Sequence, residues 1–478
     1  MTKTWIPRDY QRAQIAFNLQ HARANNWAGT GTGKTGVGLE TFCMRRLFGE
    51  VSRLLVISTK RVAQHVWTTE AAKWANFADL KIAVAVGNVV ERMEAIYSDA
   101  DIVTINYENI PWLIDTIGDA WPWDMVIADE STRLKNLRID PRTSSKGKEF
   151  LRKSGGGQRA AALAKIAHGK VRYWINLTGT PAPNGLIDLW GQAWYVDAGA
   201  RLGRSYSAFA DRWFRSVLVG TDAFARRLEP LAHADREIKE ALADCTITIE
   251  AKDYFDLPPL VRNVISVRLP AKAYAHYREM EKEMFTLVER NEIDAFNAGA
   301  KSMKLRQIIA GAAYTDDTGA YAVVHDEKID ALRDVVDDLA GSPLIVCYQF
   351  KSDLARLQKA FPQGRYFDDK ARTLADFKRG EIPILFLHPA SAAHGIDGMQ
   401  DSCHNIFFFS LTWNLEEFEQ VIERIGPTRQ AQAGHGRAVF VHVPLAADTI
   451  DEDMLDRLDT KASVQDALKA AMKKRGIC

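Results

Sequence analysis

The sequence has 478 residues, of which 47% are hydrophobic and 10% aromatic, enough for about three average domains with full cores. Its 62 Lys and Arg residues balance 61 Asp and Glu residues, so the net charge of +1 neither indicates nor excludes nucleic-acid binding. No apolar run approaches the roughly 20 residues that span a bilayer, and residues 1–10 carry no signal-peptide pattern, so we expect a cytoplasmic protein. The five cysteines lack metal-ligand spacing, which favours free thiols over a metal cluster.

The first motif along the chain is a glycine-rich loop at residues 28–35, Ala-Gly-Thr-Gly-Thr-Gly-Lys-Thr. Its glycines, Gly31 and Gly33 among them, leave the backbone free of Cβ atoms, so successive N–H groups can turn toward phosphate oxygens. Lys34 would reach the β- and γ-phosphates of a nucleotide, and the Thr35 hydroxyl would hold Mg²⁺. A helix expected from about Thr35 would add its N-terminal dipole to the same anion site. The loop therefore predicts a site for a nucleotide with Mg²⁺.

Short apolar runs recur in the first and last thirds of the chain, with helical patterns between them. The runs are largely apolar on both faces, as buried parallel strands are, so we predict an α/β fold with two doubly wound lobes. We place lobe one at residues 1–190, a helical insertion at 191–335 and lobe two at 336–478. The runs are residues 54–57, 82–86, 102–105, 125–128 and 173–177, then 344–348, 384–388, 406–409 and 438–443.

An acid pair, Asp129-Glu130, follows directly on the apolar run 125–128. Ligands of open α/β sheets bind at the C-terminal ends of the strands, which is where this pair would lie. Asp129 would hold Mg²⁺ through water, and Glu130 would act as general base on an attacking water. The simpler interpretation is a capping box for the next helix, but the preceding phosphate loop favours catalysis.

The stretch 133–172 is strongly basic, with 12 Lys and Arg residues against two acids. A solvated surface loop would explain the charge. Because the stretch follows the catalytic acids directly, we instead expect it to track the phosphate backbone of DNA. The predicted DNA contacts are Arg133, Lys135, Arg138, Lys146 and Lys148.

Aromatic residues gather in the helical patterns that follow residue 186. Their loosely helical spacing favours core packing over stacking on nucleic-acid bases. Further on, residues 264–269 form a possible short strand, and an acidic cluster at 448–459 predicts a solvated helix face. The aromatic residues are Trp190, Trp194, Tyr195, Phe209, Trp213 and Phe214.

Residues 129–136, Asp-Glu-Ser-Thr-Arg-Leu-Lys-Asn, resemble the Walker B box of superfamily 2 helicases in the Swi/Snf-like branch. That branch typically has Asp-Glu-Ala-His followed by Lys-Asn, so Thr132 replaces the His. Ala28 is the usual first residue of the superfamily's phosphate loop. Further segments resemble the family's other motifs in the family's order: residues 10–11 (the Gln motif), 54–60 (Ia), 104–108 (Ib), 177–184 (III), 344–350 (IV), 388–400 (V, as in phage-encoded members) and 420–430 (VI).

The resemblance implies two RecA-like lobes that share one ATP site. Gln11 would read the adenine, and Asp397 of lobe two would help to close the site. The motif III residues would couple ATP hydrolysis to movement on nucleic acid; they are Thr178, Gly179 and Thr180.

Motif VI contains the one serious departure from the family pattern. The family places arginines four and seven residues after the Gln equivalent to Gln420. Arg424 fills the first place, but Pro427 stands at the second, the usual arginine finger. We expect Arg429 to supply that charge instead; Arg424 acting alone, or a weak ATPase, are the alternatives.

The sequence thus predicts an ATP- and Mg²⁺-dependent translocase or helicase acting on duplex or branched DNA. The resemblance to phage-encoded members suggests a monomer that works in the host cytoplasm in phage DNA replication, recombination or repair. No nuclease motif is visible, so cleavage would need a partner protein.

Two alternatives stay open. One is an RNA helicase, although the DEAD-box kind has Asp-Glu-Ala-Asp and Ser-Ala-Thr where this chain has Asp-Glu-Ser-Thr and Thr-Gly-Thr. The other is an ATP-gated DNA clamp with little turnover, which Pro427 motivates.

Overall fold

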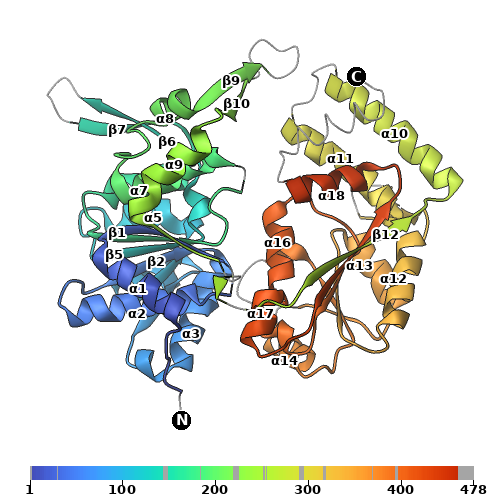
Figure 1. Ribbon diagram of the computed structural model, residues 1–478, viewed down its shortest axis with the longest axis horizontal. Coiled ribbons are helices and arrows are strands. Elements are labelled where there is room, and N and C mark those ends of the chain that lie inside the picture. Colours follow the sequence, from blue (N-terminus) through green and yellow to red (C-terminus); the bar gives the residue numbers. More distant parts are fainter. Residues whose placement is uncertain are drawn as a thin grey trace. The chain divides into compact units, whose positions relative to one another are not determined.

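The computed structural model divides the chain into two compact units. Unit 1 holds the described residues through Tyr254, and unit 2 holds those from Asp256 onward (Figure 1). The structure describes residues 3–29, 31–143, 149–183, 185–218, 226–250, 253–254, 256–289, 295–315, 319–368, 370–392 and 397–460.

Unit 1 is built on a seven-stranded sheet in which all neighbouring strands are parallel. The four strands β8, β5, β2 and β4 are buried along their whole length, which is why their sequences are apolar on both faces. In spatial order the strands are β11 (Thr246–Ile249), β1 (Arg23–Ala28), β8 (Tyr173–Thr178), β5 (Met125–Asp129), β2 (Leu54–Ser58), β4 (Ile102–Asn106) and β3 (Ile82–Ala85).

Helices cover both faces of this sheet. Alternate strand residues point to opposite sides, so Leu54 and Val56 join a core with α1–α3 while Leu55 and Ile57 join a core with α4–α9. The helices are α1 (Asp9–Gln20), α2 (Lys34–Leu47), α3 (Trp67–Lys73), α4 (Val89–Tyr97), α5 (Ile110–Ile117), α6 (Gln158–Ala167), α7 (Leu189–Asp197), α8 (Tyr206–Trp213) and α9 (Ala234–Leu242).

Two antiparallel hairpins extend unit 1. One pairs β6 (Leu137–Thr143) with β7 (Glu149–Gly156), and the other pairs β9 (Phe214–Leu218) with β10 (Arg226–Pro230). Figure 1 shows both hairpins at one end of the unit with α8, which contacts β6 and β9. Part of the basic stretch 133–172, the strands β6 and β7, therefore lies in a hairpin that projects beyond the main sheet.

Unit 2 is built on a six-stranded sheet that is also parallel throughout. Its strands in spatial order are β12 (Leu260–Val267), β19 (Val439–Ala446), β18 (Asn405–Phe408), β15 (Leu344–Cys347), β17 (Ile384–Leu387) and β16 (Arg365–Tyr366). A short hairpin joins β13 (Ala312–Tyr314) and β14 (Tyr321–Val323). The helices are α10 (Ala271–Glu289), α11 (Ala295–Ala310), α12 (Glu327–Asp338), α13 (Lys351–Ala360), α14 (Ala371–Lys378), α15 (Pro389–Ala392), α16 (Leu415–Glu423), α17 (Pro427–Gln432) and α18 (Ile450–Thr460).

The two parallel sheets confirm the predicted α/β fold class. The structure divides the region 191–335 between the units, because β11 pairs with β1 of unit 1 and β12 pairs with β19 of unit 2. The aromatic residues that follow residue 186 are buried, with Trp190, Tyr195 and Phe209 fully enclosed, so the prediction of core packing is confirmed.

The prediction of a solvated acidic face at 448–459 is wrong at its centre. Asp451 of α18 is buried and forms an ion pair with the buried Lys328 of α12, with 2.6 Å between Nζ and Oδ2. A buried carboxylate needs such a partner, because burial without one costs several kcal/mol. Nothing in the local sequence pattern marks Lys328, which is 123 residues away.

Candidate active site

The glycine-rich loop joins β1 to α2, which is the helix expected from about Thr35. Gly31 and Gly33 both have a φ of +80°, a backbone conformation that residues with a Cβ rarely adopt. The Thr32 hydroxyl donates to the Gly29 carbonyl at 2.7 Å and closes the turn. Gly33 is the N-cap of α2, so the free N–H groups of the first helical turn lie at the loop. Thr30 lies outside the described residues.

Lys34 is held across the loop by its own backbone. Its Nζ donates to the carbonyl oxygens of Ala28 at 2.8 Å and Gly29 at 3.2 Å, and the side chain is half-buried. Neutral carbonyls are weaker partners for an ammonium group than phosphate oxygens are. The loop therefore carries a fixed cation that an anion can recruit, as a phosphate site requires. Thr35 follows in the first turn of α2 and is also half-buried.

Gln11 of α1 contacts the phosphate loop directly. Its Nε2 donates to the Thr32 carbonyl at 2.9 Å, and its Oε1 accepts from the Arg8 N–H at 2.9 Å. A Cβ at position 33 would lie 2.3 Å from Gln11 Nε2, so only glycine leaves room for this contact. Gln11, which the resemblance assigns to adenine, is thus also placed to hold the loop.

Asp129 ends β5, in the same sheet as the strand that leads into the loop. Its Oδ2 accepts from the indole Nε1 of Trp67 at 3.1 Å, and its backbone carbonyl accepts from the Tyr107 hydroxyl at 3.0 Å. Burial raises the pKa of Asp129, while the charge of Lys34 and the hydrogen bond from Trp67 act in the opposite direction. The electrostatic influence of Lys34 on Asp129 indicates that the two side chains lie in one site.

Sequence reasoning missed the role of Trp67, the first residue of α3. Its ring is fully buried over α2, and a Cβ at Gly38 would lie 2.8 Å from it. The glycine at position 38 therefore lets the indole approach the acid. A tryptophan near motif Ia was visible in the sequence, but its partner was not.

Glu130 adopts a left-handed backbone conformation with φ 58° and ψ 55°. This conformation costs a non-glycine residue about 1–3 kcal/mol and persists only where the surroundings enforce it. Here it turns the chain sharply from β5 into the short 3₁₀ helix η4 (Ser131–Leu134). The acid pair is therefore held at a fixed turn, not at the start of an ordinary helix.

The predicted coupling residues lie at the C-terminal end of β8, which lies between β1 and β5 in the sheet. Thr178 pairs in register with Trp27 of β1, and the preceding Leu177 pairs with Asp129 of β5. Thr178 is fully buried, and its hydroxyl accepts from the Thr180 N–H at 3.1 Å. Gly179 and Thr180 are half-buried beside it. The sheet thus brings the phosphate loop, the acid pair and the coupling residues to one edge.

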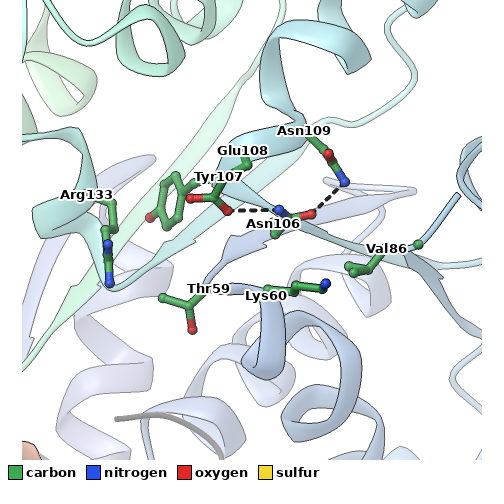
Figure 2. Close-up of a pocket in the computed structure, with 9 residues that line it drawn as sticks. Thr59, Lys60, Val86, Asn106, Tyr107, Glu108, Asn109 and Arg133 are labelled. Atoms are coloured by element: carbon green, nitrogen blue, oxygen red, sulfur yellow. Dashed lines mark hydrogen bonds between the residues drawn. The ribbon is translucent and has the colours of Figure 1, made fainter. Parts of the chain in front are cut away.

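A pocket of about 600 Å³ opens beside the acid pair (Figure 2). Its lining includes the carboxylate of Glu108 and two cationic side chains, Lys60 after β2 and Arg133 in η4. Both cations are exposed. The other residues that line the pocket are Thr59, Val86, Gly87, Asn106, Tyr107 and Asn109.

Hydrogen bonds fix the polar floor of this pocket. Asn106 Nδ2 donates to Glu108 Oε2 at 2.9 Å, Asn109 Nδ2 donates to Asn106 Oδ1 at 2.6 Å, and Arg159 pairs with Glu108. Burial raises the pKa of Glu108, but the hydrogen bonds and the nearby arginines outweigh it and hold that pKa below its usual value. Tyr107 spans the pocket and the active site, since its hydroxyl contacts Asp129.

The predicted DNA contacts have different surroundings. Arg133 is exposed in the pocket, whereas Lys135 lies 3.6 Å from Asp188 Oδ2. The Arg138 guanidinium lies 3.5 Å over the Tyr206 ring and donates to the carbonyls of Lys135 and Leu137 at 3.0 and 2.7 Å. Burial lowers the pKa of Arg138 from its ordinary value. Lys146 and Lys148 lie outside the described residues.

In unit 2, Arg429 pairs with Asp397, so the structure brings together two of the predicted site residues. Pro427 begins the helix α17, and Arg429 lies in its first turn. Arg424 is buried at the C-terminal end of α16. Residues 393–396 of the predicted motif V lie outside the described part of the chain.

Neither a metal-ligand cluster nor a membrane helix is found in the described residues. They contain no group of three or more His, Cys, Asp or Glu side chains placed to hold a metal ion. None of their helices is long and apolar enough to cross a membrane.

The chain is similar to known proteins. Residues 21–146 match the family model of the SNF2-related domain. Protein p41 of Acyrthosiphon pisum secondary endosymbiont phage 1 is 47% identical over 475 residues, which cover 99% of this chain and 100% of that protein. The chain belongs to the SNF2-related family. This membership confirms the predicted Swi/Snf-like branch of superfamily 2.

Solved structures resemble this SNF2-related chain at low sequence identity. The Hef helicase domain of Pyrococcus furiosus has a TM-score of 0.51 at 13% identity, covering 93% of this chain and 97% of that one, and it supports the two-lobed fold. The Sulfolobus solfataricus SWI2/SNF2 ATPase core in complex with dsDNA has a TM-score of 0.43 at 19% identity, covering 96% and 92%.

Proposed function

We propose that this SNF2-related chain is an ATP-dependent motor that hydrolyses ATP with Mg²⁺ to move along duplex DNA. The observation that carries the proposal is that one edge of the sheet holds the loop with Lys34 after β1 and the acid pair Asp129-Glu130 at the end of β5. The predicted coupling residues lie at the end of β8, the strand between them. Membership of an ATPase family supports hydrolysis. The 47% sequence identity with a phage protein favours a role in phage DNA replication, recombination or repair.

The residues of unit 1 fit a nucleotide with Mg²⁺. The backbone of Gly31 and Gly33 and the Lys34 ammonium would hold the phosphates, and Thr35 and Asp129 would hold Mg²⁺. ATP would supply the phosphoanhydride bond to be cleaved, and Mg²⁺ would neutralise charge on its phosphates. Glu130 would take the proton from the attacking water. Asp129 must be ionised for this role, and the hydrogen bond from Trp67 favours its ionised form.

The pocket beside the acid pair supports a DNA-binding role. Lys60 and Arg133 present two exposed cations within reach of one groove, which suits the phosphate backbone of a strand. The described lining offers no exposed aromatic ring for base stacking, because Tyr107 is 1% exposed. Backbone binding without base stacking favours duplex DNA over single-stranded RNA.

The deciding experiment measures ATP hydrolysis without nucleic acid and with duplex DNA, single-stranded DNA or duplex RNA. We expect duplex DNA to give the largest rise in kcat and Lys34→Ala to abolish turnover. Lys81→Ala is the matched control, since Lys81 is exposed and pairs with Asp99. Absence of DNA-stimulated turnover in the wild type would exclude the motor.

The alternative function is an ATP-gated DNA clamp, favoured by Pro427 at the usual position of the arginine finger. Nucleotide-dependent retention on DNA without hydrolysis would support the clamp. Preferential stimulation by RNA would instead support an RNA helicase.

A further inference from the structure

A buried glutamine joins the catalytic turn to the coupling residues. Ser131, the first residue after Glu130, donates its hydroxyl hydrogen to Oε1 of Gln192 at 2.8 Å. The other end of the same amide, Nε2, donates to the Pro181 carbonyl at 2.7 Å and the Asp188 carbonyl at 3.0 Å. One side chain of α7 therefore bonds to η4 on one side and to the residue after Thr180 on the other.

The backbone of α7 is also locked onto η4. A Cβ at Gly191 would lie 2.7 Å from the Leu134 carbonyl oxygen and 2.6 Å from that of Lys135, so the helix and the turn are in direct contact. Lys135 Nζ lies 3.6 Å from Oδ2 of Asp188, just before α7 begins. Because packed interiors deform little, a displacement of η4 would carry α7 with it.

The same glutamine reaches the strand of the phosphate loop. Its backbone carbonyl accepts from Asn176 Nδ2 at 2.9 Å, and the same Nδ2 group donates to Asn25 Oδ1 on β1 at 2.8 Å. Ser131, Gln192, Asn176 and Asn25 are each at most 2% exposed. Leaving a buried polar group without its hydrogen-bond partner is unfavourable, so the members of this set are expected to move together.

The residue at the family's usual His position does not make this connection. Thr132 is 3% exposed, and its Oγ1 has no hydrogen-bond partner among the described residues. Its neighbour Ser131 stands where the family typically has Ala, which has no hydroxyl to donate. The hydrogen-bonded link between the acid pair and the coupling residues therefore runs through Ser131 and Gln192.

We infer that Gln192 is a positioning residue that transmits movement between Glu130 and the segment 178–181, through Ser131 and the Pro181 carbonyl. It touches no reacting atom. Its effect is to make the position of the coupling residues depend on the state of the catalytic turn. This inference rests on the proposed function, because it concerns how ATP hydrolysis responds to DNA.

Two substitutions separate the two halves of the link. Ser131→Ala removes the donor on the side of η4. Gln192→Glu keeps an acceptor for Ser131 but places a carboxylate oxygen against two carbonyls, which breaks the bond to Pro181. Gln14→Met is the control for loss of a buried glutamine, since Gln14 Nε2 bonds within its own helix α1, to the Tyr10 carbonyl at 3.2 Å.

The first measurement is the ratio of DNA-stimulated to basal kcat. We expect Ser131→Ala and Gln192→Glu each to lower this ratio by about 5-fold or more, the lower end of typical couplings between sites. The double variant should be no worse than the single ones, because one link can be broken only once. The Kd of a fluorescent ATP analogue and the Tm report nucleotide binding and folding separately.

The second measurement does not need DNA stimulation. Hydrogen exchange of the amides in residues 178–192 is compared with and without a non-hydrolysable ATP analogue. In the wild type and in Gln14→Met, we expect the analogue to change the exchange rate of these amides. In Ser131→Ala and Gln192→Glu, we expect no such change, although both variants keep the wild-type Kd for the analogue. A wild type without DNA-stimulated turnover would defeat the proposed function, yet this exchange result would still decide the inference. The inference would be overturned if Ser131→Ala and Gln192→Glu showed the same change in exchange as the wild type. It would also be overturned if the analogue did not change the exchange of residues 178–192 in the wild type.

Discussion

The indole N–H of Trp67 donates a hydrogen bond to Oδ2 of Asp129 across 3.1 Å inside unit 1. Both groups are buried, and Gly38 provides the space for the ring. Burial favours the protonated form of Asp129 by raising its pKa, and the indole opposes that shift by bonding to the ionised form. Trp67 thus tunes an acid that, in the proposed function, would have to be charged to hold Mg²⁺.

Trp67→Phe should move the acid limb of the ATPase pH profile to higher pH. The raised pKa of Asp129 means that activity falls as the pH drops through it, and removal of the indole donor raises that pKa further. The measurement is kcat/KM for ATP against pH. Trp74→Phe is the control, because Trp74 donates to Glu70 instead. An unchanged acid limb in Trp67→Phe would show that the hydrogen bond does not tune the acid.

Arg429→Ala should lower kcat for ATP hydrolysis by about 10³-fold if Arg429 has the predicted role of arginine finger. The ion pair with Asp397 holds its guanidinium, and Arg429→Lys keeps the charge but loses the planar fork, so we expect only partial recovery. Arg424→Ala is measured alongside, with Tm, because Arg424 is buried and its loss also affects folding. If only Arg424→Ala abolishes turnover, Arg429 is not the finger.

Lys60→Ala and Arg133→Ala should each weaken DNA binding and reduce the slope of log Kd against log salt by about 1. Both side chains are exposed in the pocket, where they can release counterions from a phosphate backbone. Arg138→Ala is the comparison, since its guanidinium stacks on Tyr206 and bonds to two carbonyls. We expect Arg138→Ala to lower Tm more than it changes the slope. Equal slopes in all three variants and the wild type would argue against this pocket as the DNA site.

Gly191→Ala should destabilise unit 1 by about 1–3 kcal/mol, as overpacking of a tight core typically does. The added methyl group would meet the backbone carbonyls of Leu134 and Lys135, which cannot rotate away as a side chain would. Gly169→Ala is the control, because no atom lies within 4 Å of a Cβ there. Denaturant unfolding of both variants checks the prediction, and equal midpoints would mean that α7 can move off η4.

The sequence alone predicted much of the fold because buried parallel strands must be apolar on both faces. Nine runs were identified in this way, and each overlaps a strand of one of the two sheets. The strand β1 was not predicted, because it contains two polar residues, Asn25 and Asn26, although both are buried. Asn25 is tolerated only because Asn176 and Thr246, far away in sequence, satisfy its amide. No local pattern contains that information.

The same division applies to the candidate site. The phosphate loop, the acid pair and the coupling residues are predicted from the sequence alone, because each is a short local motif whose chemistry depends on residue type and spacing. Trp67, Lys60 and Gln192 depend on which strand ends lie side by side and which helix packs on them. A hydrogen bond needs two atoms within about 3 Å. Only the tertiary structure decides which distant residues meet that condition.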